Sequence, residues 1–185
     1  MTLDEQKKLL RQTCIALRAD VTCAQKAADD AALCAHIAVH PAFLQADLIL
    51  SYCAVRGEPD LSALLPIAAA RGIAVAYPRC VEKELLFHTV KGLTELIPDR
   101  FGIPAPPPSA PRAMCTARTL CLLPGLAATK NGQRLGYGGG FYDRFLAAFP
   151  GVTLFPIYDR LLFSSIPCHS LDRKADYIIT EKGEL

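Results

Sequence analysis

Residues 48–77 read LILSYCAVRGEPDLSALLPIAAARGIAVAY, and this segment indicates the architecture of the chain. Leu48–Val55 is a short apolar run, which is typical of a strand buried on both faces. Arg56–Pro59 predicts a turn, and Asp60 is a candidate cap for a helix that stops at Gly72. Ile73–Tyr77 predicts a second strand. This strand–helix–strand order favours a layered α/β domain with a largely parallel sheet.

The residues before this segment predict two helices. Thr2-x-x-Glu5 is a possible capping box for the first helix. Its expected apolar stripe runs along one face, with the basic residues on the other. The stripe consists of Leu3, Leu10, Cys14, Leu17 and Val21, and the basic face of Lys7, Lys8 and Arg11. A second helix should begin after Thr22 and stop near His40, because Pro41 follows.

The residues after the segment predict further strands and one stiff connector. The expected strands are Leu85–Val90, Thr119–Leu123, Val152–Ile157 and Tyr177–Thr180, with a helix over about 142–148. Phe101–Pro111 is rich in proline, which favours a rigid connector over a helix or a central strand. The part that follows it has too few strands to stand alone. We therefore expect one three-layer domain over residues 1–185, with helices flanking a mostly parallel sheet.

Composition excludes some classes of protein. The formal net charge is +2, from 20 basic and 18 acidic residues without a basic block, which argues against non-specific nucleic-acid binding. No apolar run approaches the roughly 20 residues that span a bilayer, and residues 1–8 lack the apolar core of a signal peptide. We expect a cytoplasmic, monomeric protein whose eight cysteines are reduced and mostly buried.

Cys34, His36 and His40 form a dense cluster of residue types that can bind a metal or serve a structural role. His36 and His40 are four residues apart and would share one face of the second helix. The number of ligands and their spacing fall short of a zinc motif. We therefore favour a helix that ends before Pro41 with polar residues on its outer side.

The glycine-rich residues 123–145 read LPGLAATKNGQRLGYGGGFYDRF. Glycines at 132, 136, 138, 139 and 140 allow backbone N–H groups to approach a ligand closely. Positive charge comes from Lys130, Arg134 and Arg144, and Asp143 offers an oxygen ligand for Mg²⁺. The segment lacks the Gly-Lys-Ser/Thr of a Walker loop, and Phe141 stands where a dinucleotide fingerprint needs glycine. These residues alone leave two readings open, an anion-binding loop or a mobile surface loop.

A longer pattern adds a resemblance to a known family. Pro124–Ala127 followed by Gly132-x-Arg134-Leu135-Gly136-x-Gly138-x-Gly140-Phe141-Tyr142-Asp143 resembles the signature of the 5-formyltetrahydrofolate cyclo-ligases. Four other segments are similar to that family in the same order: Lys7–Arg11, Tyr52–Glu58, Phe101–Pro104 and Asp172–Thr180. The chain departs from the usual pattern at Ala105, Ala128, Thr129 and Phe141.

The resemblance implies an enzyme that uses ATP and Mg²⁺ to close 5-formyltetrahydrofolate into 5,10-methenyltetrahydrofolate, with release of ADP and phosphate. It implies four sets of residues. The ATP-binding set is Lys7, Lys8, Leu9, Leu10, Arg11, Arg134, Leu135, Gly136, Tyr137, Gly138, Gly139, Gly140, Phe141 and Tyr142. The substrate-binding set is Cys53, Glu58, Tyr137, Gly138, Gly139, Gly140 and Phe141. The metal ligands are Asp143 and Asp172, and the catalytic residues are Lys7, Arg134 and Tyr142.

Plainer interpretations remain beside these roles. Lys7 and Arg11 are spaced as on a solvated helix face, and Asp143 could simply begin a helix. At the level of function, the alternatives are a non-catalytic nucleotide- or folate-binding relative with the same fold, and a dinucleotide-dependent oxidoreductase. The failed fingerprint at Phe141 disfavours the oxidoreductase.

Overall fold

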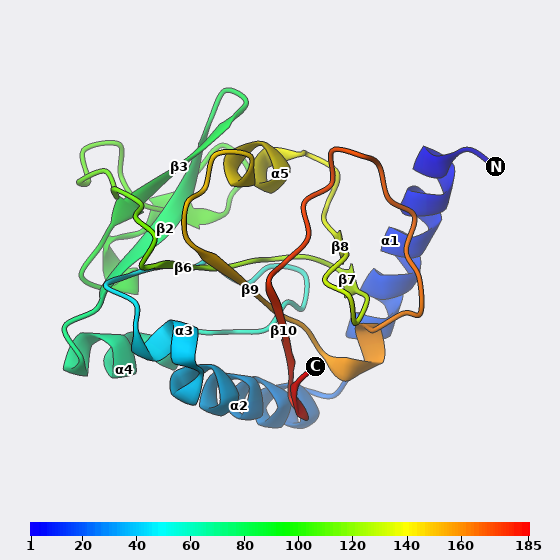
Figure 1. Ribbon diagram of the computed structural model, residues 1–185, viewed down its shortest axis with the longest axis horizontal. Helices are drawn as coiled ribbons and strands as arrows, with labels where there is room; N and C mark the ends of the chain where they lie inside the picture. The colour runs from blue at the N-terminus through cyan, green and yellow to red at the C-terminus, as the bar shows by residue number, and fades with distance from the viewer.

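A seven-stranded sheet forms the centre of the structure, a computed structural model that describes residues 1–185 (Figure 1). The strand order is β11-β10-β9-β6-β1-β2-β3. The inner strands pair in parallel and the two edge strands, β3 and β11, pair antiparallel. The strands are β1 Leu48–Leu50, β2 Ala74–Val81, β3 Glu84–Thr89, β6 Thr119–Leu122, β9 Val152–Pro156, β10 Tyr177–Thr180 and β11 Gly183–Glu184. The predicted α/β class with a mostly parallel sheet is confirmed.

Helices lie on both sides of this sheet. In Figure 1, α2, α3 and α4 lie below it, and α5 lies above it beside β3. The helices are α1 Leu3–Ala19, α2 Cys23–Val39, α3 Pro41–Leu44, α4 Leu64–Ala70 and α5 Phe141–Leu146, with 3₁₀ turns at Leu93–Glu95 and Asp159–Leu161. Two small antiparallel ladders are β4 Ile97–Pro98 with β5 Pro104–Ala105, and β7 Ala127–Ala128 with β8 Arg134–Leu135. None of the helices has the length and apolar character needed to cross a bilayer.

The central strands β1 and β6 are buried along their whole length. The unbroken apolar sequence of β1 predicts this burial, whereas β6 also buries the polar residue Thr119. Their side chains join one core with those of α2, α4 and β9, including Leu33, Ile37, Leu64 and Phe155. Because both faces of the inner strands are covered, an alternating polar pattern would leave polar side chains unpaired in the core.

The predicted start of α4 is wrong. Asp60 does not cap this helix; its carboxylate instead accepts a hydrogen bond from the N–H of Ser62 at 2.9 Å. The helix begins at Leu64 and has no side-chain cap. Pro66 explains the late start, because proline has no N–H to donate and is tolerated only in the first turn of a helix. The predicted stop is right, since Gly72 follows the helix with φ of +69°.

The orientation predicted for α1 is wrong in part, although its capping box at Thr2 and Glu5 is confirmed. The buried residues of α1 are Lys7, Cys14 and Arg18, whereas Leu17 is 39% exposed. The reason is the surface that α1 covers: it packs against loops that present carbonyl and carboxylate oxygens. Cationic side chains therefore find partners on the inner face that leucine would not.

The Cys34–His40 segment has structural contacts. Cys34 is buried, and its thiol lies 3.6 Å from the carbonyl oxygen of Asp60. The ring of His40 caps α3 by accepting a hydrogen bond from the N–H of Ala42. The other cysteines vary: Cys14 and Cys121 are also buried, Cys23 is exposed, and the remaining four are half-buried. The prediction that most of the thiols are buried is therefore wrong, because only three of the eight are.

The direction of the chain reverses between β1 and β6. From β1 the chain crosses to β2 on one side, whereas β6 leads to β9 and β10 on the other side. In open parallel sheets, ligands bind outside the carboxyl ends of the strands at such a reversal. Two segments of the resemblance start there, Tyr52–Glu58 after β1 and Pro124–Ala127 after β6.

The close approach at Gly151 generates a test of the packing. A Cβ at Gly151 would lie 2.1 Å from the carbonyl oxygen of Thr119 in β6. We expect Gly151→Ala to lower the free energy of unfolding by about 1–3 kcal/mol, because the β6–β9 pair must shift to admit the methyl group. Gly92→Ala is the matched control, since its nearest neighbour is at 3.9 Å. Equal urea midpoints for the two variants would contradict this account.

Candidate functional site

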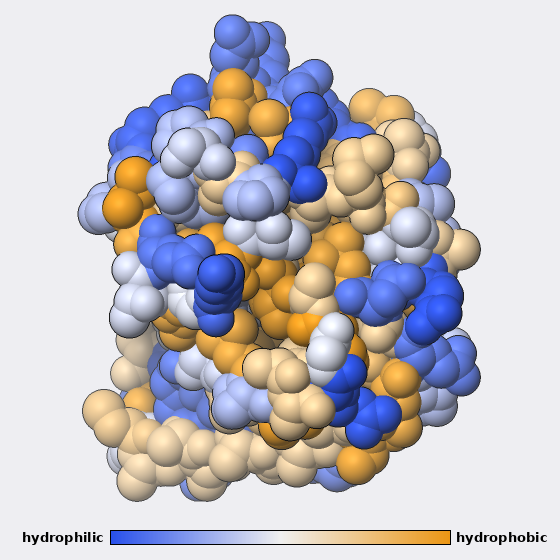
Figure 2. All heavy atoms as spheres, turned by 90° about the vertical axis from the view of Figure 1, so that its left-hand side faces the viewer, coloured by the Kyte–Doolittle hydropathy of each residue, from blue (hydrophilic) through white to orange (hydrophobic).

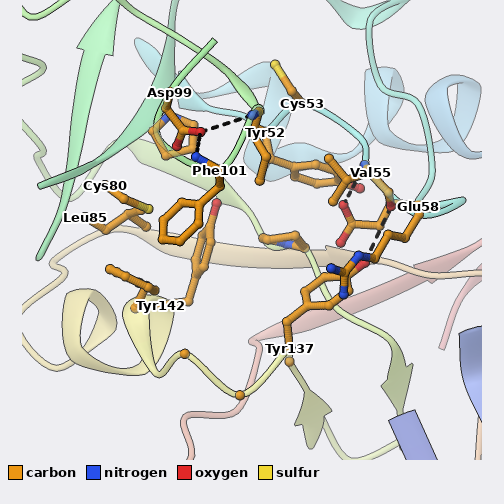
Figure 3. Close-up of a pocket in the computed structure, with 18 of the residues that line it drawn as sticks. Tyr52, Cys53, Val55, Glu58, Cys80, Leu85, Asp99, Phe101, Tyr137 and Tyr142 are labelled. Carbon is orange, nitrogen blue, oxygen red and sulfur yellow. Dashed lines mark hydrogen bonds between the residues drawn. The ribbon is translucent and has the colours of Figure 1, made fainter. Parts of the chain in front are cut away.

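A cleft of about 540 Å³ opens at the carboxyl ends of β1 and β6. Ligand sites commonly measure roughly 300–1,000 Å³. Figure 2 shows an apolar hollow on the face that carries β2 and β3, with hydrophilic side chains around it. Figure 3 shows Tyr52 and Glu58, Tyr137 and Tyr142, and Phe101 around the same space. The predicted residues that line the cleft are Cys53, Glu58, Arg134, Gly136, Tyr137, Gly138, Gly139, Gly140, Phe141, Tyr142 and Asp143.

The glycine-rich loop forms one wall of the cleft and rests on α1. Arg11 donates from Nε to the carbonyl oxygen of Gly136 at 2.9 Å. Gly138 has φ of +98°, and a Cβ there would lie 3.2 Å from the guanidinium carbon of Arg11. A side chain at residue 138 would therefore be strained and would crowd the arginine. The structure thus brings together Arg11 and the loop, which the resemblance assigns to one nucleotide site.

Two ion pairs stand beside this wall. Lys7 donates to Oδ2 of Asp172 at 2.5 Å, and Arg134 donates to Oδ1 of Asp143 at 3.0 Å. The N–H of Arg173 also donates to Oδ1 of Asp143, at 3.3 Å, so the two predicted metal ligands lie on neighbouring segments. Partial burial alone would raise the pKa of Asp172, but the Lys7 ammonium and the His169 N–H together hold it below its ordinary value.

Asp143 and Asp172 have the donor chemistry that Mg²⁺ requires. All hydrogen bonds that the protein makes to Asp143 fall on Oδ1, and all those to Asp172 fall on Oδ2. Each carboxylate keeps its second oxygen and is about one-quarter exposed. Mg²⁺ is bound in proteins by one or two carboxylates together with water and substrate phosphates. A nucleotide-linked Mg²⁺ therefore fits these residues.

Glu58 is the buried acid of the opposite wall. Its residue is 1% exposed, and Oε2 accepts a hydrogen bond from the N–H of Val55 at 3.1 Å. Oε1 is buried and has no partner. Burial raises the pKa of Glu58 to about 7, against the opposing effects of the Val55 N–H, the Arg18 guanidinium and the Tyr137 hydroxyl. Cys53 lies nearby, and burial raises the pKa of its thiol to about 11, so it is not a thiolate nucleophile at neutral pH.

Arg134 and Tyr142 face each other at the base of the cleft. The Arg134 side chain is 4% exposed, and its guanidinium also donates to the carbonyl oxygen of Pro124 at 3.1 Å. Its carbon lies 5.8 Å from the centre of the Tyr142 ring, a cation–π contact. The Tyr142 hydroxyl is buried without a hydrogen-bond partner.

Some predicted residues lie outside the cleft lining. Lys8 and Leu9 are exposed on α1, Leu10 packs against the core, and Leu135 is buried in β8. Lys130 is exposed between β7 and β8, so the expectation that it supplies charge at the loop is wrong. Arg144 instead ties the loop to the β2–β3 hairpin, donating to the carbonyl oxygens of Lys83 and Gly139.

The departures from the family pattern are mostly buried. Ala105, Ala128 and Thr129 are at most 2% exposed and do not line the cleft. The Thr129 hydroxyl accepts a hydrogen bond from the N–H of Gln133 inside the β7–β8 hairpin. Only Phe141 lies in the cleft wall itself.

Sequence reasoning missed Arg18. This residue is 6% exposed and bonds to Tyr137 and to the carbonyl oxygen of Gly125. A signal was present: residues 7, 11 and 18 repeat at helical spacing, which places all three on one face of α1.

Glu58 generates a test through the pH dependence of stability. Its pKa of about 7 in the folded protein lies above the ordinary 4.5, so the folded state binds a proton that the unfolded chain has lost. The free energy of unfolding should therefore fall as pH rises from about 4.5 to about 7. Glu58→Gln should remove this component, which is on the order of 3 kcal/mol. Urea unfolding of both proteins across the window measures it, and parallel pH curves would contradict the assignment.

Comparison with known proteins agrees with this geometry. The sequence profile described as the 5-formyltetrahydrofolate cyclo-ligase family matches residues 3–181. A 5-formyltetrahydrofolate cyclo-ligase of Mycolicibacterium smegmatis is 30% identical over 143 residues, covering 72% of this chain and 73% of the relative.

Two solved structures are similar. The 5,10-methenyltetrahydrofolate synthetase of Aquifex aeolicus superposes with a TM-score of 0.83 at 26% identity, covering 96% of this chain and 91% of that one. The synthetase of Mycoplasma pneumoniae shares the fold, with a TM-score of 0.72 at 19% identity and coverage of 95% and 98%. The match over nearly the whole chain and the cyclo-ligase relative place this enzyme in the 5-formyltetrahydrofolate cyclo-ligase family.

Proposed function

We propose that this protein uses ATP and Mg²⁺ to convert 5-formyltetrahydrofolate into 5,10-methenyltetrahydrofolate, releasing ADP and phosphate. One observation carries the proposal: a single cleft has a buried, partly unpaired carboxylate on one wall and a glycine-rich loop backed by cations on the other. The first wall suits the N–H groups of a reduced pterin, and the second suits phosphate oxygens. The distance between substrate and nucleotide is then set by one rigid pocket.

The reaction proceeds by activation of a poor leaving group. The formyl oxygen on N-5 attacks the terminal phosphorus of ATP, and the bond between that phosphorus and ADP breaks. N-10 then attacks the formyl carbon, the proton of N-10 is lost, and the carbon–oxygen bond breaks to release phosphate. Asp143 and Asp172 would hold Mg²⁺, which would supply neutralisation of charge on the phosphates. The protein supplies positioning and electrostatic stabilisation more than acid–base chemistry.

At the nucleotide end, the proposed ligands of ATP come from Lys7–Arg11 on α1 and from the loop Arg134–Tyr142. Lys7 and Arg134 carry the buried positive charges closest to the paired carboxylates. These cations stabilise negative charge that develops on the transferred phosphoryl group. Asp143 and Asp172 would hold Mg²⁺ through the oxygens that the protein leaves unbonded.

At the folate end, Glu58 and Cys53 line the wall after β1, and Tyr137 to Phe141 line the boundary between the two ligands. The buried hydroxyl of Tyr142 would find a partner on the bound ligands near the point where they meet. A cytoplasmic monomer that needs no nucleic acid or membrane remains part of this proposal.

Removal of the proposed metal ligands tests the nucleotide end. We expect Asp143→Asn and Asp172→Asn to lower turnover by at least about tenfold and to raise the Mg²⁺ concentration needed for half-maximal rate. The measurement is growth of the absorbance band of the methenyl product, with ADP release followed in parallel. Asp47→Asn is the matched control, because Asp47 pairs with Arg118 at the amino end of β1, away from the cleft.

Two outcomes would contradict the proposal. Full activity of Asp143→Asn at limiting Mg²⁺ would remove the metal role of that carboxylate. A wild-type protein that binds ATP but forms no methenyl product would instead be a non-catalytic relative with the same fold.

A further inference from the structure

We infer that Arg18 is a positioning residue for the folate side of the cleft: its buried guanidinium holds the Tyr137 hydroxyl and faces the carboxylate of Glu58. The inference rests on the proposed function, because it assigns the wall formed by Glu58 and Tyr137 to the folate. Arg18 itself does not line the cleft. It acts through the two residues that do.

The first support is the hydrogen bonding of the Arg18 fork. Nη1 donates to the Tyr137 hydroxyl at 3.1 Å, and Nη2 donates to the carbonyl oxygen of Gly125. The three residues come from α1, from the glycine-rich loop and from the segment after β6. A planar guanidinium can bond to two fixed acceptors at once, whereas an ammonium offers only a single point of charge.

The second support is the packing of the turn that carries Glu58. Gly57 has φ of +72°, and a Cβ there would lie 3.2 Å from Cβ of Arg18. The turn therefore lies directly on the stem of the arginine. The Tyr137 hydroxyl lies 3.5 Å from the carbonyl oxygen of Val55, whose N–H donates to Glu58. Arg18, Tyr137, Val55 and Glu58 thus form one connected group.

The third support is the charge around Glu58. Among the groups that shift the pKa of this carboxylate, Arg18 is the one that carries a positive charge. Tyr52 after β1, Tyr137 in the loop and Tyr142 in α5 also face it, and burial raises the pKa of each phenol, so all three are neutral near pH 7. Arg56 lies over the Tyr137 ring, 5.6 Å from its centre. Loss of the Arg18 charge would therefore raise the pKa of Glu58 further.

The position of Arg18 on α1 separates the two ends of the site. Lys7 and Arg11 contact Asp172 and the glycine-rich loop. Arg18 follows Lys7 by eleven residues, which is about 16 Å along the axis of a helix. One face of one helix therefore carries nucleotide-side cations at its beginning and a folate-side cation at its end. A change at residue 18 should affect folate much more than ATP.

The decisive experiment compares Arg18→Met with Arg18→Lys. Equilibrium binding of 5-formyltetrahydrofolate and of ATP is measured separately, and kcat/KM for the folate is followed against pH. We expect Arg18→Met to weaken folate binding on the order of tenfold and ATP binding less than twofold. The acid limb of its kcat/KM profile should move to higher pH by roughly one unit. Arg18→Lys should keep the limb near its wild-type position but recover folate binding only in part, because it restores the charge without the fork.

Two further variants show whether Arg18 acts through its neighbours. In the Glu58→Gln background, Arg18→Met should weaken folate binding by less than about fivefold, compared with about tenfold in the wild type. The effect is smaller because the carboxylate that faces the Arg18 charge is gone. Tyr137→Phe removes only the hydroxyl that Arg18 holds and should weaken folate binding. Its acid limb should move less than that of Arg18→Met, because the hydroxyl opposes the rise in the Glu58 pKa less than the guanidinium does. If Arg18→Met fails to fold, Arg18→Lys and Tyr137→Phe decide the question. Arg160→Met is the matched control, since Arg160 pairs with Asp29 at 2.6 Å outside the cleft.

Each result has one meaning. Equal losses of folate and ATP binding in Arg18→Met, or an unmoved acid limb, would overturn the inference and leave Arg18 a structural residue. A wild-type protein that neither binds nor converts the folate would overturn the proposed function instead. Wild-type turnover together with unchanged folate binding in Arg18→Met would overturn the inference alone.

Discussion

Three cations are buried around one cleft, and the burial of their charges constrains how the rest of the structure packs. The side chains of Lys7 and Arg134 are at most 7% exposed, and Arg18 is 6% exposed as a residue. An isolated charge removed from water is strongly destabilising, so each of these groups needs partners close by. The partners come from far along the chain: Asp172 for Lys7, Asp143 for Arg134, and Tyr137 with the carbonyl oxygen of Gly125 for Arg18. Charge burial therefore determines how α1 docks.

The same cations explain why the two walls of the cleft differ. Beside the glycine-rich loop, carboxylates sit in ion pairs, and the pKa of Asp172 is held below its ordinary value. At the wall that follows β1, Glu58 is more deeply buried and makes no direct hydrogen bond to a cation, so its pKa rises to about 7. The carboxyl groups of Asp172 and Glu58 thus differ in protonation behaviour, although both are carboxylic acids. Environment, rather than residue type, separates their roles.

Sequence patterns predicted the sheet well and the first helix poorly. The apolar run at β1 predicted a buried strand, because such runs have few other stable placements. The predicted strand Tyr177–Thr180 matches β10 residue for residue. On α1, the periodicity assigned Leu17 to the inside and Lys7 to the outside, and the structure reverses both. Apolar periodicity assumes an apolar surface opposite, whereas α1 meets oxygens contributed by loops that the local pattern does not describe.

For the site, too, the sequence indicated some residues and missed others. The family resemblance, rather than glycine spacing alone, implied that the loop with Arg134 and Asp143 and the acid Glu58 belong to the site, and all of them line the cleft. Arg18 was not predicted as a site residue, because its partners lie 107 and 119 residues away in the sequence. The start of α4 was misplaced because Asp60 can bond either to a helix N-terminus or, as here, to a nearby turn N–H. Local sequence carries no information that separates these two choices.

The pairing of Lys7 with Asp172 also bears on the order in which the protein is made. These residues are 165 positions apart, so the first cation of the site is synthesised long before its carboxylate. Contacts of such separation form late, because the chain between them must be ordered first. During translation α1 would therefore leave the ribosome with Lys7 still hydrated, because its partner Asp172 has not yet been synthesised. A nascent chain without the segment around Asp172 cannot form this ion pair, and it also lacks one of the two carboxylates proposed to hold Mg²⁺.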